Sequence, residues 1–198
     1  ADRQHAQEVL RAQQRLAEEK LEEQRKRLTD ARQDVEKMRM AGAQRAREAF
    51  AATRQLMTSG GSEAATFETV METAHNIVGA ERSALFIVDR ERRVLKTKTA
   101  HGTEEIVIPL NQGIVGKCVS QRSQINIPDV YKSPLFNRDV DKKTGYKTRN
   151  ILCSPIIDSD TGDVVGAVEV LNKIDGDRFT VADQEILELF AEQIAQVM

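Results

Sequence analysis

Two different patterns of apolar and polar residues follow one another along the chain, and the first covers residues 1–57. This segment has no proline and one glycine, Gly42, and it is rich in Ala, Glu, Gln, Arg, Lys and Leu, which cost the least free energy in a helix. Small and apolar residues recur in it at intervals of seven. They occupy two positions of the seven-residue repeat, which we call the seam. One position holds Leu21, Leu28, Val35, Gly42, Ala49 and Leu56, and the other holds Leu10, Ala17, Gln24, Ala31, Met38, Arg45 and Ala52.

A single helix over residues 1–57 would extend about 85 Å, which is more than a domain of this size can cover. We therefore predict a parallel homodimeric coiled coil. A solvated single helix is the alternative, because Gln24, Gly42 and Arg45 interrupt the seam.

The second pattern begins after a turn at residues 58–62, which contain two glycines and three hydroxyl residues. An amphipathic helix is predicted from Glu63 to a glycine at position 79. Short apolar or alternating runs then predict about six strands, at residues 83–89, 94–100, 105–109, 123–129, 150–157 and 164–171. A last amphipathic helix is capped by Thr180 and has no stop signal before residue 198, so we expect the parent protein to continue. The order of elements predicts an α+β fold with an antiparallel sheet.

The charges argue against one class of partner. The net charge is −2; residues 1–57 carry 13 basic and 10 acidic residues, and the rest carries 16 and 21. The basic run 25–27 directly follows Glu18, Glu19, Glu22 and Glu23, which oppose contact with phosphates. We therefore expect no nucleic acid polymer as a partner. No apolar run approaches the roughly 20 residues of a membrane span, so we expect no membrane insertion and a cytoplasmic location.

Two cysteines, Cys118 and Cys153, lie among apolar residues. We expect buried reduced thiols, with a disulfide as the alternative. No nucleophile–base pair, metal-ligand spacing or cofactor-binding loop is found, so we expect no catalytic residue, no metal and no cofactor.

The segment 111–119 (NQGIVGKCV) has part of the pattern of a phosphate-binding loop. A Walker loop requires Gly at position 111 and Ser or Thr at 118, and these positions hold Asn111 and Cys118. Two interpretations remain open: a helix start whose free amides meet a ligand phosphate, or one that simply packs Ile114 and Val115 inward.

Four stretches carry a resemblance to a known family: QGIVG at 112–116, NIPD at 126–129, TGYKTRNILC at 144–153, and Asn172-Lys173 followed by Phe179 and Asp183. They resemble a GAF domain of the cyclic-nucleotide-binding kind, found in the regulatory regions of cyclic-nucleotide phosphodiesterases and some adenylyl cyclases. The last stretch is similar to the NKFDE motif of that family. The resemblance covers residues 62–198 and implies three parts: a coiled-coil helix at 1–57, a linker at 58–62 and a GAF domain at 63–198. It also implies the GAF fold, with a central antiparallel sheet flanked by helices.

The resemblance implies that cAMP or cGMP binds between the sheet and two short helices. Ile114 and Val115 would offer backbone groups and apolar contact, and Glu169 would approach the purine edge. The family places further contacts at Asn137, Asp141, Thr144 and Thr148, although the last three are also ordinary helix-cap and loop residues. In the motif, Lys173 and Asp183 would form an ion pair beside Asn172, with Phe179 packed beneath.

Three positions depart from the family pattern. Ala84 stands where the family often has serine, so one hydrogen-bonding group is absent. Ala100 and His101 stand where relatives have an aromatic residue near the base; His101 would contact the base or lie exposed in a loop. Gln184 replaces the glutamate at the end of the motif. These departures bear on the affinity and on the choice of base.

The resemblance therefore implies a regulatory module that senses a cyclic purine nucleotide. It would transmit the change to an output domain through a homodimer formed by the N-terminal and C-terminal helices. A phosphodiesterase or cyclase domain would lie outside this chain. The alternative is a GAF domain without ligand that serves as a dimerisation or scaffold module.

Overall fold

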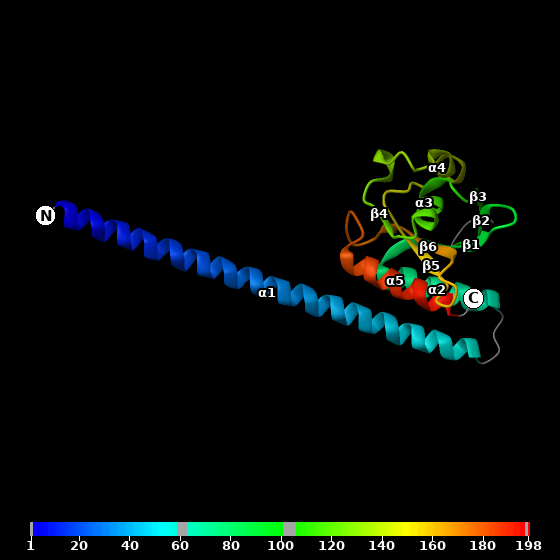
Figure 1. Cartoon of the computed structure of the whole chain (residues 1–198), viewed down its shortest axis with the longest axis horizontal. Coiled ribbons are helices and arrows are strands. Elements are labelled where there is room, and N and C mark those ends of the chain that lie inside the picture. Colours follow the sequence, from blue (N-terminus) through cyan, green and yellow to red (C-terminus); the bar gives the residue numbers. More distant parts are fainter. Residues whose placement is uncertain (1, 59–62, 101–105, 197) are drawn as a thin grey trace. The chain divides into compact units, whose positions relative to one another are not determined.

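The computed structural model describes residues 2–58, 63–100, 106–196 and 198 of the chain (Figure 1). The chain forms two compact units, Ala1–Ala41 and Gly42–Met198. Most of the predicted linker, residues 59–62, lies outside the described residues, and so does His101. The domain boundaries given above therefore stay predictions.

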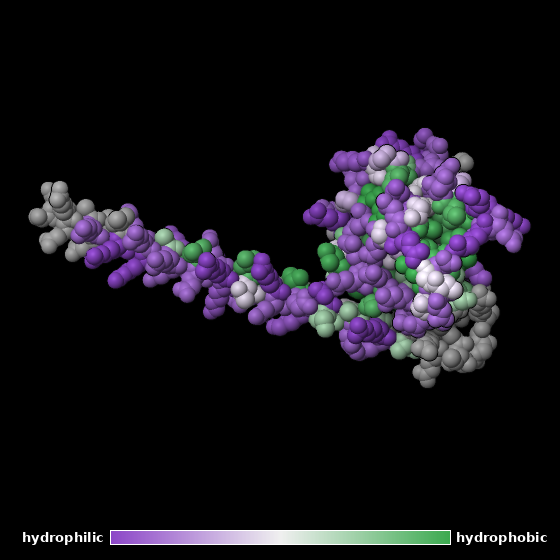
Figure 2. Space-filling model, in the orientation of Figure 1, coloured by the Kyte–Doolittle hydropathy of each residue, from purple (hydrophilic) through white to green (hydrophobic). Residues whose placement is uncertain are grey.

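The first unit is part of the long helix α1 (Asp2–Thr58). Its surface is mostly hydrophilic, with separate apolar side chains along it (Figure 2). The seam residues Leu21, Leu28 and Val35 are 49%, 55% and 61% exposed. They are therefore available to a second chain. The side chains of other seam residues lie outside the described part, namely those of Leu10, Met38, Arg45, Ala49, Ala52 and Leu56.

The second unit is built on one six-stranded sheet with the order β3-β2-β1-β6-β5-β4, in which every neighbouring pair is antiparallel. The strands are β1 (Ala80–Asp89), β2 (Val94–Ala100), β3 (Val107–Pro109), β4 (Ile125–Ile127), β5 (Ile151–Ile157) and β6 (Val164–Lys173). The predicted α+β fold with an antiparallel sheet is confirmed. Strand β1 begins at Ala80, three residues before the predicted start, and Ala80 pairs with Lys173 of β6. Strand β4 is four residues shorter than predicted.

Helices cover both faces of the sheet, and strand alternation assigns side chains to each face. On one face, α2 (Glu63–Val78), α5 (Val181–Ala195) and Ala46 of α1 pack on Leu85, Val168 and other apolar residues. On the other face, α3 (Gly113–Gln121) packs on Phe86, Ala167 and their neighbours. The same face carries the 3-10 helix η1 (Val130–Lys132) and α4 (Arg138–Thr144) (Figure 1). Leu85 and Phe86 are consecutive, so the two cores are separated by one sheet.

The C-terminal part of α1 belongs to the second unit. Ala46 is 2% exposed, and a Cβ at Gly42 would lie 3.3 Å from Cδ1 of Ile186 on α5. Gly42 therefore permits close packing of two helices within the domain, and this seam position faces the chain's own α5.

Replacing Gly166 with alanine should destabilise the domain, because a Cβ there would overlap with the backbone carbonyl of Phe86 on β1. We expect a loss of about 1–3 kcal/mol in the free energy of unfolding and a Tm lower by roughly 3–10 °C, measured by thermal denaturation. Gly162→Ala is the control, because no atom lies within 4 Å of that position and only its φ of 71° is unfavourable. Equal losses in the two variants would contradict this account.

Candidate functional site

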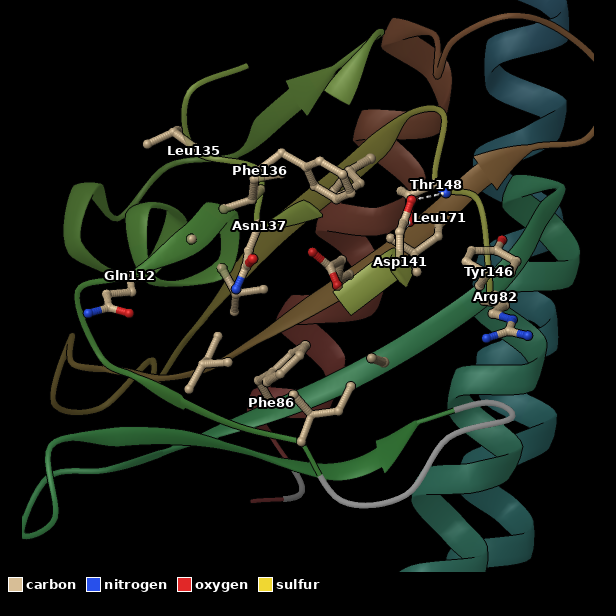
Figure 3. A pocket seen from close by; sticks show the side chains of 18 of the residues that line it. Arg82, Phe86, Gln112, Leu135, Phe136, Asn137, Asp141, Tyr146, Thr148 and Leu171 are labelled. Carbon is tan, nitrogen blue, oxygen red and sulfur yellow. Dashed lines mark hydrogen bonds between the residues drawn. The ribbon is translucent and has the colours of Figure 1, made fainter. Parts of the chain in front are cut away.

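A cavity of about 650 Å³ lies between the sheet, α3, residues 134–137 and the segment that contains α4 (Figure 3). Its volume falls within the range that small ligands use. Apolar side chains dominate its walls, and a few polar ones are distributed among them. The lining residues are Arg82, Ser83, Ala84, Phe86, Ile106, Val107, Ile108, Pro109, Gln112, Gly113, Ile114, Val115, Pro134, Leu135, Phe136, Asn137, Asp141, Tyr146, Thr148, Ile151, Glu169 and Leu171.

The sheet forms one wall of the cavity, which we call the floor, and strand alternation explains which side chains lie on it. Ala84 and Phe86 point to this face from β1, and Glu169 and Leu171 line it from β6. Ala84 is the register partner of Glu169 on the neighbouring strand. The floor is therefore two adjacent strands with a single carboxyl group among apolar side chains.

The first turn of α3 forms a second wall. Ile114 and Val115 are 5% and 4% exposed and line the cavity together with Gly113. The side chain of Gln112, the N-cap residue, makes no capping hydrogen bond. The first amides of the helix therefore have neither an intrahelical partner nor a side-chain cap, and they give this end a partial positive charge.

The third wall is the segment 137–148, which we call the lid. Asn137 begins α4 by accepting a hydrogen bond from the amide of Asp139 at 3.0 Å, and Gly145 ends it with a φ of 68°. A residue in that left-handed conformation is usually glycine. The capping residues thus account for a short helix at this place in the sequence.

Asp141 fastens the lid. Its Oδ2 accepts hydrogen bonds from the Tyr131 hydroxyl and the Thr148 amide, both at 2.8 Å, and its Oδ1 accepts one from Thr148 Oγ1 at 2.7 Å. Asp141 is 8% exposed. The bond to its carboxylate raises the pKa of the Tyr131 hydroxyl. We call Tyr131, Asp141 and Thr148 the latch, because they tie η1, α4 and the end of the lid together.

Glu169 is in the opposite situation. Its half-buried side chain has no hydrogen bond or ion pair within the part of the chain that the structure describes. Burial raises the pKa of this carboxyl group to about 7. A carboxyl group that loses part of its hydration without gaining a partner is costly. Glu169 would therefore be stabilised by a hydrogen bond to a molecule in the cavity.

Arg82 is the single cation among the described residues that line the cavity. Its guanidinium lies 3.9 Å from the centre of the Tyr146 ring, in cation–π geometry. The Tyr146 hydroxyl donates a hydrogen bond to Glu81 at 2.9 Å. Arg82 is therefore held at the cavity by an aromatic ring that is itself fixed.

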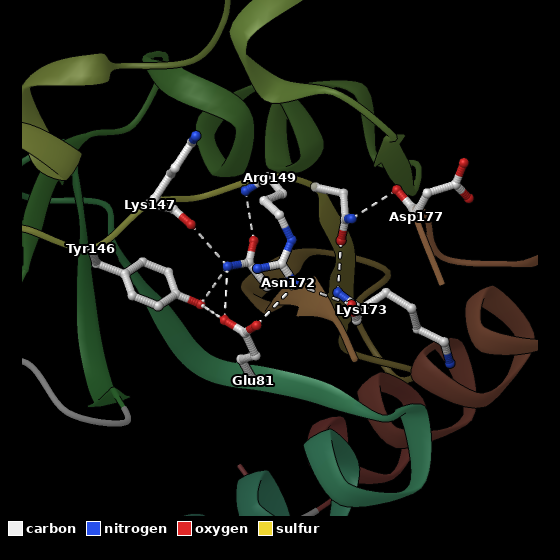
Figure 4. A network of polar contacts seen from close by, with 8 residues as sticks. Glu81, Tyr146, Lys147, Arg149, Asn172, Lys173 and Asp177 are labelled. Atoms are coloured by element: carbon white, nitrogen blue, oxygen red, sulfur yellow. Dashed lines mark hydrogen bonds and ion pairs between the residues drawn. The ribbon is translucent and has the colours of Figure 1, made fainter. Parts of the chain in front are cut away.

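A polar network holds the end of the lid to the sheet (Figure 4). Asn172 is buried at the end of β6 with a φ of 58°. Its Nδ2 lies 2.9 Å from Glu81 Oε2, 2.8 Å from the Tyr146 hydroxyl and 2.9 Å from the Lys147 carbonyl. Its Oδ1 accepts a hydrogen bond from the Arg149 amide at 2.6 Å. Asn172 thus fixes the chain directly after the lid.

Lys173, the next residue, connects the sheet to the helices on the other face. Its ammonium donates to Asp183 Oδ1 at 2.9 Å and to the Val78 carbonyl at 2.6 Å. Asp183 also accepts from the Thr180 amide at 2.7 Å, as part of a capping box at the start of α5. The expected ion pair is present, and Phe179 is 2% exposed.

The structure brings most of the sequence-predicted contact residues to one cavity, namely Ala84, Ile114, Val115, Asn137, Asp141, Thr148 and Glu169. Ala100 lies at the end of β2, in register with Ala84, and its side chain is outside the described part. The side chain of Thr144, the last residue of α4, is likewise not described, and His101 lies outside the described residues.

Several lining or latching residues were not predicted as site residues from the sequence, among them Arg82, Phe86, Tyr131 and Tyr146. Arg82 and Phe86 are two positions before and after Ala84, so alternation along β1 would have found both. Tyr131 and Tyr146 lie in irregular segments. Such segments have no periodic pattern of apolar residues from which the direction of a side chain could be predicted.

The cysteines and the possible metal ligands were considered next among the described residues. Cys118 and Cys153 are buried and free, as predicted, and burial raises the pKa of the Cys153 thiol. In the part of the chain that the structure describes, no three His, Cys, Asp or Glu residues are grouped so as to hold a metal ion. No helix in that part has the length and hydropathy of a membrane span.

Comparison with known proteins finds a matching family model and related sequences. The GAF domain family model matches residues 62–198. The chain is 38% identical over 136 residues to the Caenorhabditis elegans "Probable 3',5'-cyclic phosphodiesterase pde-5", covering 62% of this chain and 18% of that protein. It is 34% identical over 128 residues to the Takifugu rubripes "Dual 3',5'-cyclic-AMP and -GMP phosphodiesterase 11A", covering 58% and 14%. It thus spans less than a fifth of the length of these relatives.

Solved structures show the same fold. The GAF domain of a phosphoenolpyruvate-protein phosphotransferase from Coxiella burnetii superimposes with a TM-score of 0.67 at 16% identity, covering 78% of this chain and 92% of that one. A free methionine-R-sulfoxide reductase from Neisseria meningitidis gives 0.63 at 15% identity, covering 76% and 86%. At these identities the likeness concerns the fold alone.

Replacing Tyr131 with phenylalanine should loosen the latch while keeping the ring, which packs 5.5 Å from that of Phe136. The lost hydrogen bond to Asp141 should cost about 1 kcal/mol, so amide hydrogen exchange in residues 137–149 should accelerate roughly fivefold. Exchange in β1 and β6 should not change. Ser120→Ala, which removes an exposed hydroxyl from α3, is the control. Unchanged exchange in the lid of Tyr131→Phe would show that the latch does not hold it.

Proposed function

Because the chain belongs to the GAF domain family, we propose that its cavity binds a cyclic purine nucleotide, cAMP or cGMP, as a regulatory signal. The observation that carries the proposal is the distribution of polar groups in the cavity. Uncapped amides lie at one wall and a carboxyl group without a partner lies on the floor. Between them the walls are largely apolar. A cyclic nucleotide has the matching parts: a singly charged phosphate, a polar sugar and a flat base with hydrogen-bonding edges.

The phosphate belongs at the start of α3. The amides of Gly113, Ile114 and Val115 have no intrahelical acceptor, and the helix dipole favours an anion there. A singly charged phosphate does not need a lysine at this position, and among the described lining residues there is none. Placing the phosphate at the start of α3 corresponds to the ligand-binding interpretation of residues 111–119.

The sugar and base would occupy the rest of the cavity. Phe86 and Phe136 offer aromatic surface, Asn137 and Thr148 offer hydrogen bonds from the lid, and Glu169 faces the base. Ala84, Ala100, Thr144 and His101 remain predicted contact positions. Asp141, whose oxygens already accept three hydrogen bonds, would act on the ligand by holding the lid closed.

The signal would leave through the end of β6. A ligand that orders the lid changes the segment that Asn172 holds, and the adjacent Lys173 contacts the end of α2 and the start of α5. Movement of the lid would therefore shift both helices. Any output domain, such as a phosphodiesterase, would lie in a part of the protein that this chain does not contain.

We also propose that the chain forms a homodimer through the seam of α1. The exposed Leu21, Leu28 and Val35 recur every seven residues, and a second copy of the same helix presents the matching surface. The C-terminal helix α5 would add to this interface in the assembled protein.

The second candidate function is a GAF domain without ligand that serves as a dimerisation or scaffold module. Ala84 favours it, because the floor next to Glu169 offers no side-chain hydrogen bond at that position. The same binding experiment separates the two functions.

The proposal predicts that cAMP or cGMP binds to the purified chain with one site per chain. Calorimetric titration should give saturable heat, and ligand at one hundred times its Kd should stabilise the domain by about 2.7 kcal/mol. The non-cyclic 5'-monophosphate of the same base is the control, because its doubly charged phosphate does not match uncapped amides without a cation. No heat and no rise in Tm at millimolar nucleotide would refute binding and leave the scaffold function.

The homodimer predicts that Leu28→Glu together with Leu21→Glu lowers the mass measured by sedimentation equilibrium to that of one chain. Two carboxylates in an apolar seam repel their copies and are costly to bury. Thr29→Glu together with Glu22→Asp is the matched control on the same helix but off the seam, and it should remain dimeric. If both double variants keep the mass of the unchanged chain, α1 does not form the interface.

A further inference from the structure

We propose that the protonation state of the Glu169 carboxyl group selects the base: the ionised form takes guanine and the protonated form takes adenine. This inference depends on the proposed binding of a cyclic purine nucleotide and deepens it.

The position of Glu169 makes its carboxyl group available to a ligand. It lines the cavity from β6, between its register partners Ala84 on β1 and Cys153 on β5. Neither neighbour supplies a hydrogen-bonding group that pairs with it, and no described residue forms a hydrogen bond or ion pair with it. Asp141, the other carboxylate of the cavity, is saturated by the latch. Glu169 is therefore the one carboxyl group among the described lining residues that can read a base edge.

The base, rather than the phosphate, is the part of the ligand that fits beside Glu169. A carboxylate repels the phosphate, whereas the amides at the start of α3 attract it. The neutral base is then directed to the opposite side of the cavity, where it meets the floor formed by β1 and β6.

The two forms of the carboxyl group match different bases. A carboxylate has two acceptor oxygens, and the edge of guanine presents two adjacent donors, N1–H and the N2 amino group. A protonated carboxyl group has one donor and one acceptor, and the edge of adenine presents N1 as an acceptor and the N6 amino group as a donor. When the carboxylate meets adenine, one of its acceptors faces the N1 lone pair. When the protonated carboxyl group meets guanine, its donor faces one of the two donors of the base.

The environment lets both forms exist near neutral pH. Burial raises the pKa of Glu169 to about 7. The charged and titratable groups around it are Arg82 on β1, Asp141 and Tyr146 from the lid and the residue that follows it, Cys153 on β5, and Cys118 on α3 beneath Cys153. Burial alone accounts for the raised pKa of Glu169.

The sign of the pH dependence follows from the raised pKa. Glu169 is protonated below about pH 7 and ionised above it. Affinity for cGMP should therefore fall as the pH decreases through 7, and affinity for cAMP should fall as the pH increases through 7. Between pH 6 and pH 8 the populations of the two forms each change about tenfold. The ratio of the two Kd values should then change about one hundredfold.

The experiment measures the Kd of cAMP and of cGMP for the purified chain at pH 6, 7 and 8 at constant ionic strength. Glu169→Gln supplies one donor and one acceptor at every pH, as the protonated carboxyl group does. We expect this variant to bind cAMP with the affinity of the unchanged chain at pH 6, independently of pH, and to bind cGMP weakly throughout. Glu188→Gln, which alters an exposed glutamate on α5, is the control and should keep the original pH profile.

The outcomes separate this inference from the proposed function. If both nucleotides bind but the ratio of their Kd values stays constant from pH 6 to pH 8, the selection of the base by Glu169 is refuted and nucleotide binding stands. The same holds if Glu169→Gln keeps the pH dependence of the unchanged chain. If neither nucleotide binds at any pH, the proposed function itself is refuted, and the selection of the base by Glu169 is refuted with it.

Discussion

The ammonium group of Lys173 holds together the elements on which the cavity depends. It joins the last carbonyl of α2 to Asp183 in the first turn of α5. The side chains of Lys173 and Asp183 are 13% and 8% exposed. Removing one member of such a buried pair leaves the other charge unpaired, at a cost of about 3–5 kcal/mol. Because Asn172 directly precedes it, the same two residues of β6 fix the end of the lid on one face and the helices on the other. The left-handed backbone of Asn172 is consistent with a residue constrained by several partners at once.

The cavity combines a pre-formed floor with a lid that is fastened by only a few polar contacts. The floor belongs to central strands, each paired on both sides, so it cannot move without breaking the sheet. The lid has a short helix and the latch. Segments with few buried contacts open at a lower free energy than the core of a domain. In the proposed function, a ligand would meet a floor that is already in place, while the lid would adjust around it.

Much of this arrangement could be predicted from the sequence, for reasons that differ from residue to residue. Glu169 interrupts an apolar strand, and alternation together with the cost of burying a carboxyl group marked it as facing a cavity. Ile114 and Val115 follow a glycine at a helix start, which is a local signal. The pairing of Asp141 with Tyr131 could not be predicted, because these residues lie on two irregular segments whose paths depend on tertiary contacts. The stacking of Arg82 on Tyr146 was missed for the same reason.

The two cysteines provide a natural probe of how the cavity side of the sheet opens. Cys118 and Cys153 are the only thiols in the chain, both are fully buried, and both belong to the core on the cavity side of the sheet. No cysteine lies in the core that α2 and α5 form on the opposite side. The rate at which an alkylating reagent modifies the native chain therefore reports the opening of one half of the domain, without any introduced label. Comparing that rate with the rate of global unfolding would show whether the cavity side opens independently of α2 and α5.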